Sequence, residues 1–262
     1  MTAMEPPVSR KRPAFRRLPA DRRRDQIIEA AVEVFGRRPE PEVSIDDVAA
    51  AAGTSRSSMY RYFEGKQELY GAAAQRVAAA LVERLEQAGQ GPRPVPPSVL
   101  MATRLALYLD FLEQYEAGYA GLLGRGGARA PEAALAAVRR VRAAAEEMTC
   151  RALQVSEPGA PLRTTVRSWV AGVEWAGAEW LRTRTPPRPV LERLLAAQFA
   201  TMLVGAAALD AQAAGRVAWL LEVEPAGSPF GALVRSVAGT FDRPMVAQLA
   251  RFLGHRDAPG SP

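Results

Sequence analysis

The chain shows the hydrophobic periodicity of amphipathic helices, with no alternating β-branched run long enough for a convincing strand. Between Arg22 and Gly36, apolar residues recur at the i, i+3, i+4, i+7 and i+8 positions that form one helical face. This face comprises Ile27, Ala30, Ala31, Val34 and Phe35. The pattern predicts a helix that Gly36 ends and, with the segments that follow, an all-helical protein.

Two shorter helices joined by a glycine turn are predicted next. Ser44 is a typical N-cap and Asp47 supplies an acid at the third helical position. Gly53 ends this helix, because glycine readily adopts positive φ. A third helix is expected over residues 56–63, with Ser55 as its cap. This helix buries Met59 and Phe63 and exposes Arg56, Ser57, Tyr60, Arg61 and Tyr62.

The rest of the chain reads as a series of longer helices. The helix after Gly65 continues toward Leu85 and is long enough to connect two domains. Further helices are predicted over residues 100–115, 131–154, 161–181 and 189–209, with breaks at 89–97, 118–127 and 224–230 and a last amphipathic segment at 233–253. The expected organisation is an arm (1–20), a three-helix head with a helix-turn-helix (21–66), a larger helical domain (67–255) and a disordered tail (256–262).

Neither secretion nor a membrane span is indicated. Cys150 is the single cysteine, so no disulfide can close within the chain, as is typical of a reducing cytoplasm. The basic N-terminus has no apolar stretch behind it to form a signal peptide. The longest apolar run, Leu194–Leu209, is interrupted by Gln198 and falls short of a membrane span. We therefore expect a cytoplasmic protein without a membrane partner.

The excess of positive charge is confined to the N-terminus. The first 24 residues hold eight basic side chains against Glu5 and Asp21, and eight minus two equals the net charge of +6. Prolines prevent a regular helix there. Two interpretations of residues 1–20 stay open: an arm that contacts a polyanion, or a disordered tail or leader with no part in binding.

The third predicted helix is crowded with groups that suit DNA recognition. Hydroxyls near its start can approach phosphates closely, and Arg56 is long enough to reach guanine edges in a major groove. Lys66 also suggests DNA binding. A cation in the first turn of a helix interacts unfavourably with the macrodipole, and a phosphate bound there would compensate for this. The alternative is a purely structural corner of a helical bundle.

The segment from Ser44 to Leu69, SIDDVAAAAGTSRSSMYRYFEGKQEL, resembles the DNA-binding domain of the TetR family of repressors. The matching features are the turn Ala52-Gly53, the helix start Ser55-Arg56, the run Tyr60-Arg61-Tyr62-Phe63, and Lys66. Tyr62 stands where many members have histidine, and Gly65 replaces a common serine cap.

The resemblance implies that double-stranded DNA contacts the third helix, with Ser44 and Lys66 on phosphates. The candidate DNA-binding residues are Ser44, Thr54, Ser55, Arg56, Ser57, Ser58, Tyr60, Arg61, Tyr62 and Lys66. It further implies a repressor that binds a roughly palindromic operator as a homodimer and is released by a small-molecule effector.

Catalytic constellations are scarce. His255 is the one histidine and lies near the end of the chain, so it is the single candidate for the general base of a Ser-His-Asp or Cys-His arrangement and is poorly placed for that role. The sequence has no zinc-type Cys/His cluster, and the glycines at 124–127 lack a preceding strand. The pair Glu146-Glu147 is typical of a solvated helix face. We expect no enzyme, cofactor or metal; the alternative is a helical enzyme or ligand-binding protein whose helix-turn-helix corner is only structural.

Aromatic and methionine side chains recur in the central helices. Core packing is the ordinary explanation for such stripes, but the resemblance implies that an effector lies among these helices, which favours an apolar or aromatic effector. The candidate effector-binding residues are Met101, Tyr108, Phe111, Tyr115, Met148, Trp169 and Trp175.

A dimer interface is expected from two apolar surfaces. One is the helical face of Trp169, Val173, Ala176, Gly177 and Trp180; the other is the segment Leu194–Leu209. An interior helix pair explains the pattern equally well. The family resemblance favours a four-helix interface with a second copy.

Overall fold

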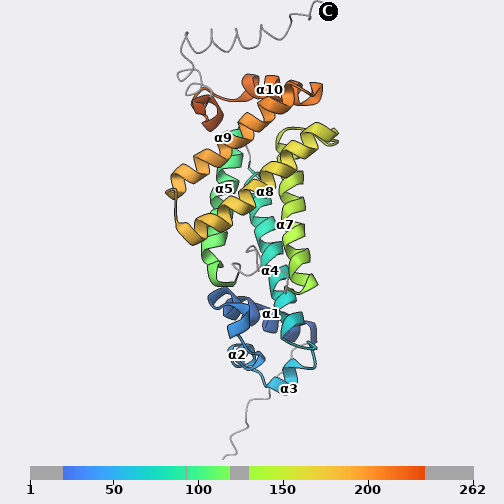
Figure 1. Ribbon diagram of the computed structural model, residues 1–262. Coiled ribbons are helices and arrows are strands. Elements are labelled where there is room, and N and C mark those ends of the chain that lie inside the picture. The colour runs from blue at the N-terminus through green and yellow to red at the C-terminus, as the bar shows by residue number, and fades with distance from the viewer. Residues whose placement is uncertain (1–19, 92–93, 119–129, 234–262) are drawn as a thin grey trace, which may run out of the picture.

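The computed structural model describes residues 20–91, 94–118 and 130–233, and every regular element in these ranges is a helix (Figure 1). The helices are α1 (Ala20–Arg37), α2 (Ile45–Ala51), α3 (Arg56–Met59), α4 (Lys66–Gln87), α5 (Pro97–Gln114), α7 (Glu132–Ala152), α8 (Ala160–Thr183), α9 (Arg188–Ala207) and α10 (Ala211–Val223), with a 3-10 turn at Glu40–Glu42. The prediction of an all-helical fold is confirmed.

Several predictions lie outside the described residues. These are the basic arm up to residue 19, the greater part of the second glycine-rich break, the last amphipathic segment after Leu233, His255 and the tail 256–262.

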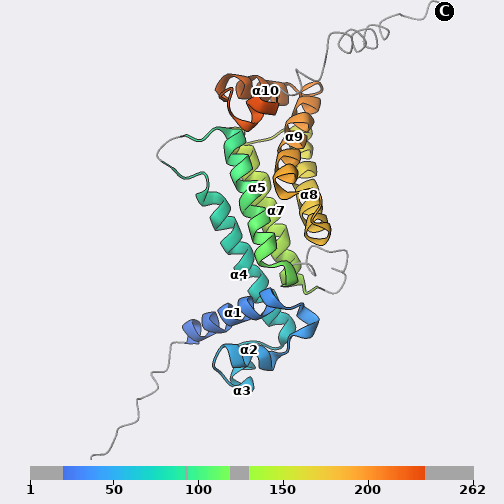
Figure 2. The ribbon, with the colours of Figure 1, turned by 90° about the vertical axis from the view of Figure 1, so that its left-hand side faces the viewer.

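Helices α1, α2 and α3 form a small head at one end of an elongated molecule (Figures 1 and 2). Apolar residues from all three helices meet in its centre, together with Phe63. The buried set includes Ile27, Ala31, Phe35, Val48, Met59 and Phe63. The predicted inward face of α3 is correct, and that of α1 is correct in part, because Ala30 and Val34 are only partly buried and Ile28 is buried as well. Burying such side chains is the main source of the head's stability.

Helix α4 runs from the head into the upper part of the molecule, where it lies beside α7 (Figure 1). Midway along α4, Arg76 forms ion pairs with Asp25 and Glu29 of α1. Closer to the start of α4, the hydroxyl of Tyr70 donates a hydrogen bond of 3.2 Å to the carbonyl of Gly118, just beyond α5. Burial and the charge of Glu40 raise the pKa of Tyr70 to about 12, so this phenol remains a donor at neutral pH.

The upper part consists of a layer of α4, α5 and α7 against which α8 and α9 pack, with α10 at the far end (Figure 2). The face of α8 expected at a dimer interface points into this layer instead. Trp169, Val173 and Trp180 are buried within the chain, and Gly177 lies against α5. The prediction for this face is wrong, because the interior of the same chain buries it. The opposite face carries Trp175, which is 65% exposed.

The helices differ from prediction in several places. Helix α1 continues through Gly36 to Arg37, so Gly36 does not end it. Helix α3 ends at Met59, not Phe63, because the next amides form i→i+3 bonds: Arg61 N–H to Ser58 O and Tyr62 N–H to Met59 O. Helix α10 was missed entirely. Asp210 caps it by accepting a hydrogen bond of 2.9 Å from the amide of Ala213, so an N-cap signal was present in the sequence.

Helix α9 carries a broad apolar surface. By length and composition alone, Arg188–Ala207 is long and apolar enough to cross a membrane, and 28% of its most apolar stretch is buried. This differs from the prediction that the apolar run in this region falls short of a span. The helix nevertheless begins with Arg188, which is bonded to α5, and packs against α5, α8 and α10. It is therefore an integral element of the helical domain.

Candidate nucleic-acid interface and effector cavity

The start of α2 is held by a capping box. The amide of Asp47 donates to the Ser44 hydroxyl at 3.2 Å, and the amide of Ser44 donates to the Asp47 carboxylate at 2.8 Å. Hydrogen bonds from Ser44, assisted by Arg38, lower the pKa of Asp47 to about 2. The predicted cap is confirmed, and it satisfies backbone donors that would otherwise lack partners.

A Schellman motif forms the turn between α2 and α3. The amide of Thr54 donates to Ala49 O and the amide of Gly53 to Ala50 O, at 2.9 and 3.1 Å. This geometry requires the positive φ of 58° that Gly53 adopts, as predicted. Arg23 of α1 donates to the carbonyl of Gly53 at 3.1 Å and so ties the turn to the rest of the head.

Helix α3 presents its polar groups to solvent. Ser55 caps the helix by accepting from the amide of Ser58 at 3.2 Å. Arg56 donates to Asp46 Oδ2 at 2.6 Å and to the Tyr60 hydroxyl at 3.3 Å. The hydrogen bond with Tyr60 has the largest effect in raising the pKa of Arg56, and the charge of Asp46 adds to it. Tyr60 is 47% exposed. The sequence analysis missed Asp46, although its place at the start of α2 was visible.

The segment after α3 combines a polar outer surface with a buried anchor. Phe63 is buried, and the Arg24 guanidinium lies 4.9 Å from the centre of its ring. Arg61 is exposed and donates to the Tyr62 hydroxyl at 3.1 Å, while Tyr62 packs partly against the core. A tyrosine at this position therefore keeps a polar tip near the surface.

Lys66 has an intramolecular partner. Its Nζ lies 2.9 Å from Glu40 Oε1 and donates to the Glu40 backbone carbonyl at 3.1 Å. Gln67 also donates to the Glu40 carboxylate. Glu40 thus offsets the unfavourable interaction of Lys66 with the α4 dipole. A DNA phosphate is therefore not needed to explain a lysine at the start of α4. The phosphate contact stays a prediction.

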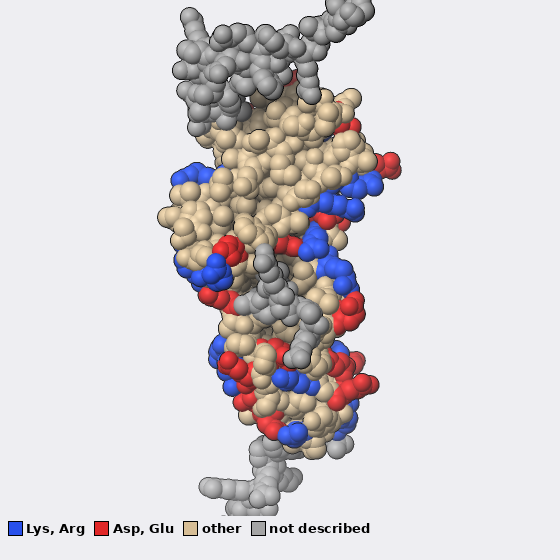
Figure 3. Space-filling model, viewed as in Figure 1, with Lys and Arg blue, Asp and Glu red and all other residues tan. Residues whose placement is uncertain are grey.

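All ten candidate DNA-binding residues lie in one region of the head that includes α2, α3 and the start of α4. Those classed as exposed are Ser44, Ser55, Arg56, Ser57, Tyr60 and Arg61; those partly buried are Thr54, Ser58, Tyr62 and Lys66. Basic and acidic side chains alternate on the side of the head that Figure 3 shows, so this side has no uniformly positive field. Its DNA-binding potential depends on individual side chains.

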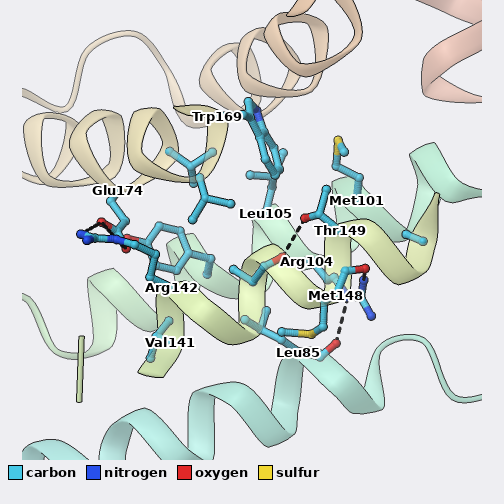
Figure 4. A pocket seen from close by; sticks show the side chains of 15 residues that line it. Leu85, Met101, Arg104, Leu105, Val141, Arg142, Met148, Thr149, Trp169 and Glu174 are labelled. Carbon is cyan, nitrogen blue, oxygen red and sulfur yellow. Dashed lines mark hydrogen bonds and ion pairs between the residues drawn. The ribbon is translucent and has the colours of Figure 1, made fainter. Parts of the chain in front are cut away.

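A narrow apolar cavity of about 80 Å³ lies between α4, α5, α7 and α8. Figure 4 shows Leu105, Met148 and Trp169 around this space, with the Arg142–Glu174 pair on one side and Arg104 on another. The single Nε–H of Arg142 is shared between the two carboxylate oxygens of Glu174, each at 3.1 Å, and Nη2 donates to Oε2 at 2.5 Å. Arg104 donates to the carbonyls of Leu85 and Met148, and its pKa is lowered by burial and by nearby Arg151.

The structure divides the seven candidate effector-binding residues. Met101, Tyr108, Met148 and Trp169 line this cavity, whereas Phe111, Tyr115 and Trp175 do not. The rings of Phe111 and Tyr115 contact each other with centroids 4.9 Å apart, and Tyr115 lies against Gly36 of α1. Trp175 faces solvent. Helical spacing does not reveal which face of a helix meets a cavity, so an effector contact by these three residues stays a prediction.

A wider cavity of about 710 Å³ adjoins the first and is formed by α5, α7, α9, α10 and the segment after α10. The two spaces share Met101, Thr149 and Ala152 as lining residues. The wider cavity is mainly apolar, with Phe199, Leu203 and Phe230 among its walls. Its volume is in the usual range for small-molecule sites, and the sequence analysis did not predict it.

Little in the described ranges supports other chemistry. Within them, no group of three His, Cys, Asp or Glu side chains could hold a metal ion. Cys150 is buried as a free thiol, and burial raises its pKa, which disfavours the reactive thiolate.

Comparisons with known proteins agree with this architecture. Residues 27–73 match the model of bacterial regulatory proteins, tetR family, and residues 97–202 match a tetracyclin repressor-like C-terminal domain. A TetR-family transcriptional regulator from Streptomyces coelicolor, known from a crystal structure, is 36% identical with a TM-score of 0.77; the match covers 85% of this chain and 99% of that one.

Two further proteins are similar over less of the chain or in fold alone. The transcriptional activator FasR of Mycolicibacterium smegmatis is 36% identical over 103 residues, 39% of this chain and 46% of FasR, and the chain spans less than half the length of the curated relatives it matches. FadR of Bacillus subtilis, solved in complex with stearoyl-CoA, shares 16% identity, with a TM-score of 0.50 and coverage of 68% and 96%. At that identity the likeness shows only the fold. This chain belongs to the TetR family of DNA-binding transcriptional regulators, which are not enzymes, because its helix-turn-helix head and helical C-terminal domain match the family and because it is similar to the Streptomyces regulator.

Proposed function

We propose that the chain is a cytoplasmic repressor that binds a palindromic operator as a homodimer through α3 and is released by a small apolar or aromatic effector. The observation that carries the DNA-binding site is the exposed set of Arg56, Ser57, Tyr60 and Arg61 in and just after α3. Ser55 and the Gly53 turn fix the direction of this helix. A short helix held in this way can place an arginine against base edges in a major groove.

The DNA-binding site is tested by replacing its side chains. Selection of bound sequences from random duplex DNA first defines an operator. Arg56→Ala and Tyr60→Ala are each expected to weaken operator binding by about 1–3 kcal/mol, because each removes a base or phosphate contact. Fluorescence anisotropy measures the affinity, and Arg37→Ala, which removes an exposed arginine at the end of α1, is the matched control. Wild-type affinity in both variants would rule out this site.

The dimer is supported by the outward faces of α8 and α9. Figure 3 shows a broad surface without charged residues over these helices. Trp175 is 65%, Leu194 46% and Val204 54% exposed, and large apolar surfaces of this kind mark protein interfaces. A twofold interface would bury this surface in a bundle of four helices. Leu194→Glu is therefore expected to shift the chain toward monomer in sedimentation equilibrium; a wild-type chain that is already monomeric at micromolar concentration would contradict the dimer.

The effector site is supported by the two adjoining cavities and by their connection to the head. Helix α5 lines both cavities at Met101 and contacts α1 at its other end, where Tyr115 lies against Gly36. A ligand that displaces α5 can thus change the position of α1. This arrangement gives the effector a physical route to the DNA-binding head.

The fold shared with FadR, which was solved with stearoyl-CoA, makes apolar chains a reasonable first class of effector to test. Titration of the operator complex with stearoyl-CoA, free fatty acids and planar aromatic compounds, followed by anisotropy, should find a class that releases DNA. No release by any apolar class would contradict the effector proposal. Because FasR is named as an activator, transcription from an operator-linked promoter with and without the protein must establish the sign of regulation.

A further inference from the structure

An acidic side chain lies on the proposed DNA-binding face and contacts its central arginine. Asp46 occupies the first turn of α2, and its Oδ2 accepts a hydrogen bond of 2.6 Å from Arg56 Nη1. The other terminal nitrogen of Arg56 donates to the Tyr60 hydroxyl at 3.3 Å. The Arg56 guanidinium is thus held on two sides, by a neighbouring helix and by the residue that follows α3.

Stability accounts for only part of the role of Asp46. Its carboxylate lies in the first turn of α2, where it interacts favourably but weakly with the helix dipole, while the capping box uses Asp47 and Ser44. Both Asp46 and Arg56 are more than half exposed, and ion pairs between such side chains contribute little to folding. A carboxylate on this face also repels DNA phosphates and lowers affinity for every sequence. The helix dipole explains an acid at this position, but its direct contact with Arg56 calls for a functional explanation.

We propose that Asp46 is a positioning residue that orients Arg56 for base recognition, and so increases sequence specificity at the expense of overall DNA affinity. This inference rests on the proposed role of α3 in DNA binding. A free arginine side chain samples many rotamers, and ordering it on DNA costs entropy. In the observed arrangement each terminal nitrogen of Arg56 still has a second N–H for the oxygen and nitrogen acceptors of guanine. Asp46 reduces the entropic cost by holding the guanidinium before DNA arrives.

The experiment compares sequence preference with overall affinity in the full-length protein. Repeated selection from random duplex DNA with Arg56→Ala identifies the base position at which guanine preference depends on Arg56. Asp46→Ala is expected to reduce that preference about fivefold, because the bidentate contact is no longer preorganised. The same variant should bind scrambled DNA about two- to threefold more tightly at low salt, because a negative charge is lost.

Two variants separate orientation from charge. Asp46→Asn removes the charge but keeps an acceptor for Arg56, so it should raise affinity for scrambled DNA like Asp46→Ala while retaining more of the guanine preference. Glu33→Gln removes an exposed acid of α1 that pairs with Arg37 rather than Arg56, and should leave the preference unchanged. Thermal unfolding of each variant confirms that the head remains folded.

The outcomes are distinct. If Asp46→Ala binds all sequences more tightly and keeps the wild-type guanine preference, Asp46 is only a repulsive charge and the inference is overturned. In an Arg56→Ala background, Asp46→Ala should change the preference at that position no further; an additional loss would also overturn it. If Arg56→Ala itself alters neither affinity nor preference, Arg56 does not read a base and the inference is overturned; the proposed DNA-binding site as a whole fails only if Tyr60→Ala also binds with wild-type affinity.

Discussion

Gly71→Val is expected to lower the free energy of unfolding by about 2–3 kcal/mol, because it forces apart two closely packed helices. A Cβ atom at Gly71 of α4 would lie 2.6 Å from the Cβ of Ala133 in α7. Both atoms are attached directly to the backbone, so no change of rotamer can relieve the overlap. The helices themselves must move, and the packing between α4 and α7 is lost along their shared length.

Gly215→Val is the matched control for this prediction. Gly215 is also a helical glycine, in α10, but no atom lies within 4 Å of the Cβ that a substitution would add. Its replacement should change stability by no more than about 0.5 kcal/mol. Urea unfolding followed by circular dichroism at one fixed protein concentration measures both variants. Equal stabilities would mean that α4 and α7 do not approach so closely.

Arg188→Ala is expected to cost about 2–3 kcal/mol, because Arg188 joins the start of α9 to α5. Its guanidinium donates to Asp110 at 2.6 Å, Glu113 at 2.8 Å and Glu192 at 2.9 Å, and also to the carbonyl of Ala106. The side chain is 25% exposed, so the cost lies between those of surface and fully buried ion pairs. Without it, three carboxylates lose a common cation.

The control for Arg188 is an exposed arginine with a single acidic partner. Arg182 pairs with Glu179 three residues earlier, and its side chain is 71% exposed. Arg182→Ala should therefore cost less than about 0.5 kcal/mol. The same urea unfolding experiment applies, with raised salt as a second condition that weakens both pairs. A cost for Arg188→Ala as small as that for Arg182→Ala would show that the cluster contributes nothing beyond a surface ion pair.

Interactions between residues close in sequence were predictable for this protein. The capping box of Ser44 and Asp47, the Ser55 cap and the positive φ of Gly53 involve neighbours within one or two helical turns. Each of these features depends on the types of a few adjacent residues, and the structure confirms each predicted feature. The helix-turn-helix, the all-helical fold and the resemblance to the TetR family follow from this local information.

Contacts between residues distant in sequence were decided by the tertiary structure. The periodicity of α8 revealed two faces but not that Trp169 points inward and Trp175 outward, because a helical pattern contains no information on what packs against each face. Lys66 meets Glu40, and Asp46 meets Arg56, only because the turns of the head bring these residues together. The two cavities are likewise the space left between helices after packing, and their size depends on every side chain around them.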